Sequence, residues 1–324
     1  MYKQVLACAV LCTSLSIQAA PDPWVVLEKA AFAARQLNYQ GIFVYQNGAQ
    51  MRSVQITHMN NDGHELARNL VLDGEPREVF SQGNDVVIFN AKPNKVVIEK
   101  RHGQNLFPAM LPTNLDAIKG SYSAKLGEVE RVAGRDAQIV NLIPNDGLRY
   151  FYRVWTDVEF GLLLKMMLIN NQKQPLEQIG FTQLSMLNSH DLDWFQPKME
   201  SNKNYEMEKM QEVGRVTDDW VIANLPPGYR KVDHILVSVA GKKAPINQLI
   251  FSDGIASVSL FIEPLLKGMR PKMGHRVEGS THICANVVDG YQVMVVGEVP
   301  AETVTQISKA ISFKKNATNA VDDK

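Results

Sequence analysis

The sequence is poor in the features that mark several common classes of protein. It has 3 cysteines in 324 residues, too few for a disulfide scaffold, and its 34 lysines and arginines balance 34 aspartates and glutamates. A nucleic-acid-binding protein usually carries a basic excess, so the zero net charge argues against that class. No apolar run reaches the roughly 20 residues that a membrane-spanning helix needs. Because the chain is longer than one hydrophobic core usually supports, two domains are expected.

The first 20 residues have the order of parts found in a secretory signal peptide. A short basic start precedes an apolar stretch over residues 5–17, and cleavage is expected near Ala19/Ala20. Neither early cysteine stands where a lipidated cysteine would. Cleavage would leave Cys284 as the one thiol, so no intrachain disulfide is expected. The sequence therefore predicts a soluble exported protein, and the lack of a disulfide suits a Gram-negative periplasm.

The chain also lacks the motifs of common catalytic sites, including the Gly-x-Ser-x-Gly elbow, the phosphate-binding loop and the dinucleotide glycine fingerprint. His64-Glu65 begins like a zinc-protease helix, but Arg68 stands where the second histidine ligand belongs. His282 and Cys284 share a face of an expected strand, yet a thiolate–imidazole pair needs a third orienting group. The apolar neighbours of Cys284 favour a buried small side chain. We therefore expect a protein that is not an enzyme, with no catalytic residue, metal or cofactor.

The mature chain has the pattern of two β-rich domains. Asp22 followed by proline starts an expected helix, and short strand-like segments separated by turns come next. In the first domain these segments are residues 41–46, 52–59, 86–90, 96–100, 122–132, 137–143, 149–156, 162–169 and 176–184. Short connections predict a mostly antiparallel sheet. The expected units are a signal peptide at 1–20, a sheet domain at 21–196, a linker at 197–214, a small domain at 215–316 and a polar tail at 317–324.

Two strands of the first domain stand out from this background. Residues 162–169 are apolar on both faces except at Lys165, so the strand needs a cover on each side. Either helices cover both faces, or one face is left to an acyl ligand, for which flexible methionines are suited. Residues 149–155 combine aromatic and basic side chains. Such a strand is either an edge that meets a partner or a sheet strand with one solvated face.

A set of short motifs runs through both domains in a definite order. They are Leu37-Asn38-Tyr39, Asp73-Gly74-Glu75-Pro76-Arg77, Tyr152-Arg153-Val154-Trp155-Thr156-Asp157, Leu225-Pro226-Pro227-Gly228-Tyr229, Phe251-Ser252-Asp253-Gly254 and Val296-Gly297-Glu298-Val299-Pro300. Their order and spacing resemble the RseB/MucB family of periplasmic negative regulators of the envelope-stress sigma factor. The resemblance runs from about Pro23 to Phe313.

This resemblance implies an α+β fold. A large N-terminal unclosed antiparallel β-barrel with covering helices, similar to lipoprotein carriers of the LolA type, would precede a smaller C-terminal α/β domain. It also implies a regulator that binds the periplasmic segment of a single-pass membrane anti-sigma factor and shields it from regulatory proteolysis. Lipid or lipopolysaccharide acyl chains would release it, and in some bacteria the system controls alginate production. Self-association is left open as a further interaction.

The residues of the two implied sites are hypotheses. We expect a lipid cavity to include Phe89, Trp155, Met166 and Leu168, and a partner-binding face to include Tyr229, Phe251 and Asp253. The turn Ser252-Asp253-Gly254 is equally well a simple hairpin. Alanine at Phe251 and Tyr229 is expected to weaken capture of the anti-sigma segment with little loss of folding.

Two other functions stay open on the sequence. The first is a periplasmic carrier of lipid or lipoprotein with no regulatory role, which the same half-barrel would serve. A carrier would not retain the anti-sigma segment in a pull-down. The second is an exported hydrolase that uses Cys284, which loss of a measured activity in Cys284→Ala would support.

Overall fold

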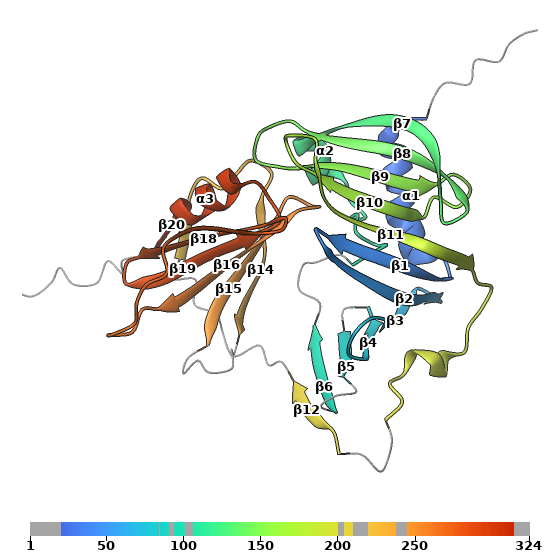
Figure 1. Cartoon of the computed structure of the whole chain (residues 1–324), viewed down its shortest axis with the longest axis horizontal. Helices are drawn as coiled ribbons and strands as arrows, with labels where there is room; N and C mark the ends of the chain where they lie inside the picture. The colour runs from blue at the N-terminus through green and yellow to red at the C-terminus, as the bar shows by residue number, and fades with distance from the viewer. Residues whose placement is uncertain are drawn as a thin grey trace, which may run out of the picture.

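The computed structural model describes residues 21–83, 85–90, 94–100, 106–199, 204–209, 220–237 and 245–313. The expected signal peptide and polar tail lie outside these residues. Two β-rich domains of unequal size make up the described chain, and Figure 1 shows them side by side.

The large domain is built on one curved, unclosed 12-stranded sheet, in the order β12-β6-β5-β4-β3-β2-β1-β11-β10-β9-β8-β7. Its strands are β1 (Tyr39–Asn47), β2 (Gln50–Asn61), β3 (His64–Val71), β4 (Arg77–Gln82), β5 (Asp85–Asn90), β6 (Lys95–Lys100), β7 (Tyr122–Val132), β8 (Arg135–Pro144), β9 (Phe151–Asp157), β10 (Leu163–Ile169), β11 (Pro175–Met186) and β12 (Glu206–Lys209). All neighbours pair antiparallel except β12, which pairs parallel with β6.

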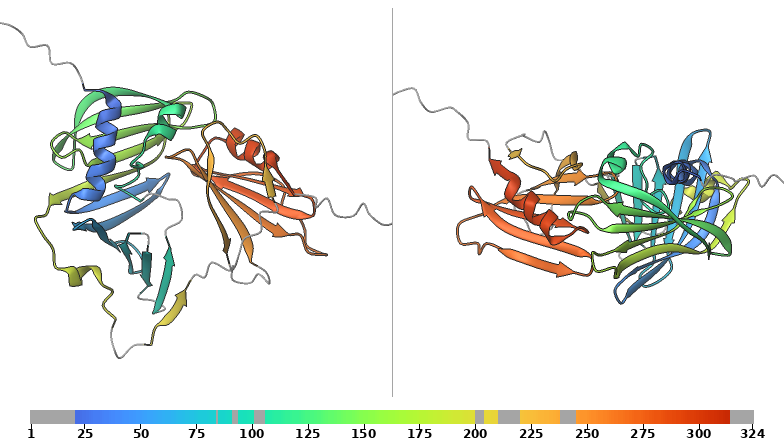
Figure 2. Two further views of the ribbon diagram at one scale, coloured as in Figure 1. Left: turned by 180° about the vertical axis from the view of Figure 1, so that it is seen from behind. Right: turned by 90° about the horizontal axis from the view of Figure 1, so that it is seen from above.

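Helix α1 (Pro23–Gln36) begins as the sequence predicts, because the Asp22 side chain accepts a hydrogen bond from the Trp24 amide and proline takes the first turn. Its buried side chains are Leu27 and a row of alanines, which let the helix lie close to the strands. Figure 2 shows α1 crossing one face of the sheet. Helix α2 (Asp116–Ser121) buries Ile118 in the same core.

Two strands and part of the expected linker differ from the sequence analysis. Strands β3 and β4 occupy a stretch in which only turns were expected. Charged side chains interrupt the alternation of apolar and polar residues in both strands. Arg68 of β3 and Glu78 of β4 form an ion pair at 2.6 Å. The Arg68 guanidinium also lies 4.2 Å from the centroid of the Trp194 ring. Trp194 belongs to the short 3-10 helix η1 (Leu192–Phe195). Strand β12 lies within the range expected to be a linker.

The small domain has a six-stranded antiparallel sheet in the order β14-β15-β16-β19-β18-β17. Its elements are β13 (Trp220–Ile222), β14 (Arg230–Val237), β15 (Ile246–Ser252), β16 (Ser257–Pro264), β17 (Gly274–Glu278), β18 (Thr281–Val288), β19 (Tyr291–Gly297), α3 (Ala301–Ala310) and β20 (Ile311–Phe313). Val304 and Ile307 of α3 complete its core against Val258 and Val295. The expected α+β class, with a large unclosed antiparallel sheet and a smaller C-terminal domain, is confirmed.

Candidate functional site

The four residues expected to line a lipid cavity are not gathered in one place. Met166 and Leu168 of β10 are 2% and 3% exposed and belong to the core on the face that α1 covers. Those exposed fractions leave no opening to solvent over either side chain. Trp155 is paired with Lys165, and paired residues of neighbouring strands point to the same face. Lys165 and Met166 are adjacent in β10 and point to opposite faces, so Trp155 lies on the face opposite Met166. The Lys165 ammonium lies 4.7 Å from the Trp155 ring centroid, on that same face.

Phe89 is separated from the other three by most of the sheet. It lies on β5, and strands β4, β3, β2, β1 and β11 stand between β5 and β10. The Phe89 ring packs against Tyr205, with ring centroids 5.5 Å apart. Of the four expected residues, Met166 and Leu168 share one face of β10, and Trp155, also 3% exposed, joins the same buried core cluster from the other face. Phe89 lies apart from all three.

The three residues expected on a partner face do lie close together, but they are buried. Phe251 is 1% exposed within the core of the small domain, and Tyr229 is 6% exposed beside it. Asp253 is completely buried against the large domain. All three side chains belong to the contact between the domains or to the core beneath it, and their part in partner binding stays a prediction.

At the centre of this contact is a buried ion pair between the two domains. Arg149 precedes β9 of the large domain, and Asp253 lies in the turn between β15 and β16 of the small domain; neither has any exposed side-chain surface. Nε of Arg149 donates to Oδ2 of Asp253 at 2.7 Å. The same guanidinium also donates to the Asp146 carboxylate and to the carbonyl oxygen of Pro227. We call Arg149, Asp253 and the residues that contact them the interdomain junction.

Local sequence explains why Asp253 is presented so firmly. Its Oδ1 accepts hydrogen bonds from the amides of Ile255 at 3.0 Å and Ala256 at 2.8 Å. Gly254 has a φ of 108°, a conformation that favours glycine. The Ser252-Asp253-Gly254 segment is therefore a hairpin turn and also the part of the small domain that reaches the large one, since Ile255 packs against the large domain's core.

A second turn of the small domain closes over the ion pair. Gly228 has a φ of 80°, and a Cβ atom placed on it would overlap Oγ of Ser121 and approach Nη2 of Arg149 to 3.1 Å. Only glycine allows both this conformation and this closeness. The Arg149 guanidinium lies 5.0 Å from the ring centroid of Tyr229, which follows Gly228. The Pro226-Pro227-Gly228 turn is thus shaped to lie against the large domain.

Burial controls the protonation of the phenols in the junction. Desolvation, followed by the negative charge of Asp253, raises the pKa of Tyr122 and of Tyr229 well above the ordinary value. Both hydroxyls are therefore protonated at physiological pH. The Tyr122 hydroxyl lies 3.5 Å from Oδ2 of Asp253, where it can donate to the carboxylate.

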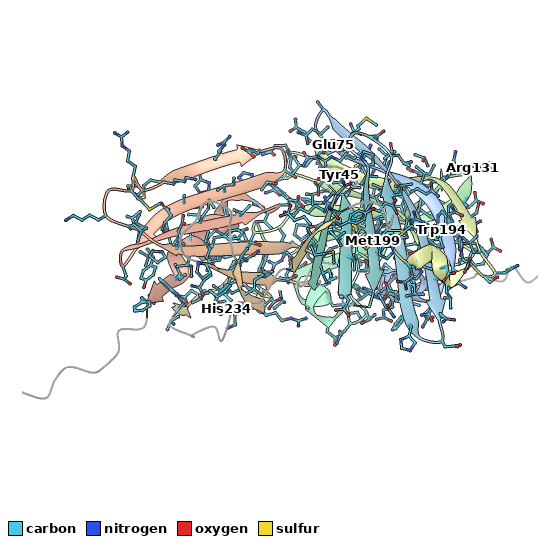
Figure 3. All side chains as sticks on the ribbon, turned by 90° about the horizontal axis from the view of Figure 1, so that it is seen from below. Tyr45, Glu75, Arg131, Trp194, Met199 and His234 are labelled. Carbon is cyan, nitrogen blue, oxygen red and sulfur yellow. The ribbon has the colours of Figure 1, made fainter. Side chains whose placement is uncertain are left out.

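A separate cluster joins the domains at the end of β11. Oε2 of Glu177 accepts from the Tyr45 hydroxyl at 2.8 Å and from Oγ of Ser280 at 3.2 Å, and Ser280 accepts from the Asn47 amide at 3.1 Å. Glu298 of the small domain hydrogen-bonds to Glu177. Desolvation there, and then the charge of Glu177, raise the pKa of Glu298 to about 7. Tyr45 is labelled in Figure 3, near the boundary between the domains.

Sequence reasoning singled out Arg149 and Asp253 without joining them. They are 104 positions apart, and Arg149 was expected in a strand that meets solvent or a partner. Glu298 stands in one of the motifs that carry the family resemblance, but sequence reasoning assigned it no role and did not join it to Glu177. The described residues hold no group of three His, Cys, Asp or Glu side chains that is arranged for a metal ion. In the same part of the chain, no helix has the length and apolar character needed to cross a membrane.

Comparison with known proteins defines the class to which this architecture belongs. The family model for the MucB/RseB N-terminal domain matches residues 22–199, and the model for the MucB/RseB C-terminal domain matches residues 215–312. The chain therefore belongs to the MucB/RseB family.

Particular relatives match along both domains. The sigma factor AlgU regulatory protein MucB of Pseudomonas aeruginosa is 30% identical over 88% of this chain and 89% of that protein. The sigma-E factor regulatory protein RseB of Haemophilus influenzae is 25% identical over 89% of this chain and 90% of that protein. The crystal structure of MucB in complex with MucA(peri) matches with a TM-score of 0.72 and 28% identity, covering 91% of this chain and all of that one.

Proposed function

We propose that this protein binds the periplasmic segment of a membrane anti-sigma factor and shields it from regulatory proteolysis. One observation carries the proposal: the similarity to MucB in its complex with MucA(peri) extends over 91% of this chain and so includes both domains. The relatives that match the chain are named as regulatory proteins of sigma factors. The exported, periplasmic location and cleavage near Ala19/Ala20 are parts of the same proposal.

In this proposal the interdomain junction fixes the two domains at the angle that receives the segment. A segment that contacts both domains binds more tightly when their relative placement is already set, because less conformational freedom is lost on binding. The Arg149 guanidinium holds the two domains together through its bonds to Asp253 and to the Pro227 carbonyl oxygen of the small domain. Tyr229, Phe251 and Asp253 then act on the partner indirectly, as positioning residues.

The packed core of the large domain suggests how lipid would release the anti-sigma segment. Met166 and Leu168 are covered, so an acyl chain that reached them would have to displace a helix from the sheet. Ile118 of α2 is buried in that core, and a Cβ atom placed on Gly254 would lie 3.0 Å from Ile118 Cγ1. Moving α2 would therefore disturb the junction. A lipid that prefers the loosened arrangement shifts the protein toward it and lowers its affinity for the anti-sigma segment.

Capture of the segment tests the proposal directly. The mature chain is mixed with a labelled periplasmic segment of the anti-sigma factor, and binding is followed by fluorescence anisotropy. We expect saturable binding, with protection of the segment from the regulatory protease at the same protein concentrations. A periplasmic lipid carrier with no regulatory role would neither retain the segment nor protect it, and that result would reject the proposal.

A further inference from the structure

One stretch of the small domain is exposed along its whole length. Every residue from 266 to 279 is exposed, covering most of the connection between β16 and β17 and the edge strand β17 itself. We call residues 265–273 the β16–β17 loop. The register places this loop at the end of the sheet where Pro264 pairs with Tyr291. Ser280, at the opposite end of β17, contacts the large domain. The loop therefore lies at the end of the small domain that points away from the large sheet (Figure 1).

Large apolar side chains are concentrated on this exposed stretch. Leu266 is 55% exposed, Met269 is 42% exposed, Met273 is 66% exposed, and Val277 on β17 is 55% exposed. An isolated exposed apolar side chain is ordinary, but several within a dozen residues on one protruding segment indicate a surface that another phase or molecule covers.

Basic side chains alternate with these apolar ones. Lys267, Arg270 and Lys272 lie in the loop and Arg276 follows on β17, against Glu278 as the only acidic residue of the stretch 266–279. Glu278 pairs with Arg276 at 2.6 Å. The whole chain has zero net charge, so this positive stretch is a local feature. Basic and apolar side chains mixed on one protruding segment are the composition of a membrane-surface anchor.

The loop is held in shape rather than left as a free tether. The Leu265 amide donates to the Gly290 carbonyl oxygen at 3.0 Å, which fixes the start of the loop. The Gln292 side chain accepts from the Lys272 amide at 2.6 Å and donates to the Lys272 carbonyl oxygen at 2.9 Å, which fixes its end. The Met269 amide donates to the Leu266 carbonyl oxygen at 3.0 Å, closing a turn between them.

We propose that the β16–β17 loop docks the protein on the surface of an anionic lipid bilayer. The apolar side chains enter the boundary between headgroups and acyl chains, and the basic side chains lie against the phosphates. The side chains protrude, whereas a peptide ligand is usually received in a groove or along an unblocked sheet edge. Charged side chains on β17 make it a poor edge for adding a strand. The proposal goes beyond the proposed function, because it requires no anti-sigma factor.

Vesicle sedimentation tests this proposal with the mature chain. The probes are vesicles of phosphatidylcholine mixed with phosphatidylglycerol, and vesicles of phosphatidylcholine alone. We expect binding to the mixed vesicles that weakens with added salt, and much weaker binding to the neutral ones. No binding to the mixed vesicles by the unaltered protein would overturn the proposal.

Two loop variants and one matched control identify the surface. Lys267→Ser, Arg270→Ser and Lys272→Ser together should weaken binding to the mixed vesicles at least about tenfold, since each basic side chain near an anionic surface is worth roughly a factor of five. Leu266→Ser, Met269→Ser and Met273→Ser together should also weaken it. The control combines Arg52→Ser, Lys125→Ser and Lys173→Ser, which removes the same charge from exposed positions of the large domain and should leave binding close to that of the unaltered protein.

The same variants separate this proposal from the proposed function. Both loop variants should bind the anti-sigma segment as the unaltered protein does. Loss of segment binding with vesicle binding retained would assign the loop to a peptide partner and overturn the membrane proposal. An equal loss of vesicle binding in the control would show that overall charge, not the loop, is responsible. Failure of the unaltered protein to bind the segment would instead count against the proposed function alone.

Discussion

The ion pair between Arg149 and Asp253 makes the sharpest prediction about this protein. We consider Arg149→Met and Asp253→Asn, separately and together. Asparagine keeps an oxygen that can accept from the Ile255 and Ala256 amides, so the hairpin turn is preserved while the charge is removed. Neither side chain has exposed surface in the folded protein. Arg149→Met leaves the buried Asp253 carboxylate without its cation, and Asp253→Asn leaves the buried Arg149 guanidinium with the partly exposed Asp146 as its remaining anionic partner. We expect each to lower the free energy of unfolding by about 3–5 kcal/mol.

The double variant should lose less stability than the sum of the two single losses, because it removes both fully buried charges and leaves only the partly exposed Asp146 carboxylate in the junction. The loss of unfolding free energy in the double variant should be smaller than the sum of the two single losses by about 1–3 kcal/mol, which is the coupling energy of the two positions. The assay is urea unfolding of all four proteins, together with hydrogen exchange at the Ala256 amide, which reports opening of the junction itself.

A pair of similar distance but different burial provides the control. Arg276 and Glu278 lie 2.6 Å apart with 74% and 58% of their side chains exposed. Such exposed pairs contribute less than about 1 kcal/mol. If Asp253→Asn lowered the free energy of unfolding no more than Glu278→Gln does, burial would not be what makes the Arg149–Asp253 pair important for stability.

Three further predictions concern the junction and its surroundings. Gly228→Ala should open the junction and weaken segment capture, because its Cβ would overlap Ser121, with Gly48→Ala, also at positive φ but facing open space, as the control in hydrogen exchange and binding. The pKa of Glu298 is raised from 4.5 to about 7, so its contribution to stability is full below pH 4.5 and is lost as the pH rises to 7. The melting temperature should fall over this pH range in the unaltered protein, and this contribution to the fall should be absent from Glu298→Gln. Phe251→Ala should destabilise the small domain by about 3–5 kcal/mol, measured by urea unfolding, contrary to the expectation of little loss of folding.

The sequence was most informative where side-chain alternation is simple. The segments that form β7 to β11 were predicted close to their observed bounds. Strands β3 and β4 were missed because charged residues such as Arg68 and Glu78 give the segment the composition of a loop. In the structure these two side chains form an ion pair across the strands. A charged residue at an inward-facing strand position interrupts the apolar–polar alternation, and the sequence of that strand does not reveal the oppositely charged partner on the next strand.

The candidate site was predictable only in part, for a related reason. Asp253, Tyr229 and Arg149 were all singled out, but nothing local indicates that Arg149 and Asp253 meet across 104 positions. Trp155 and Met166 were expected in the same cavity. The register pairs Trp155 with Lys165 and so turns it to the opposite face. Which residues share a face of a sheet depends on register, and register is set by pairing that one strand's sequence does not contain.

The most direct test of the account is the rate at which the regulatory protease cleaves the periplasmic segment of the anti-sigma factor in the presence of this protein. Saturating protein should suppress cleavage, and Asp253→Asn, which loosens the junction, should restore much of it. Cleavage at the same rate with and without the unaltered protein would contradict the account.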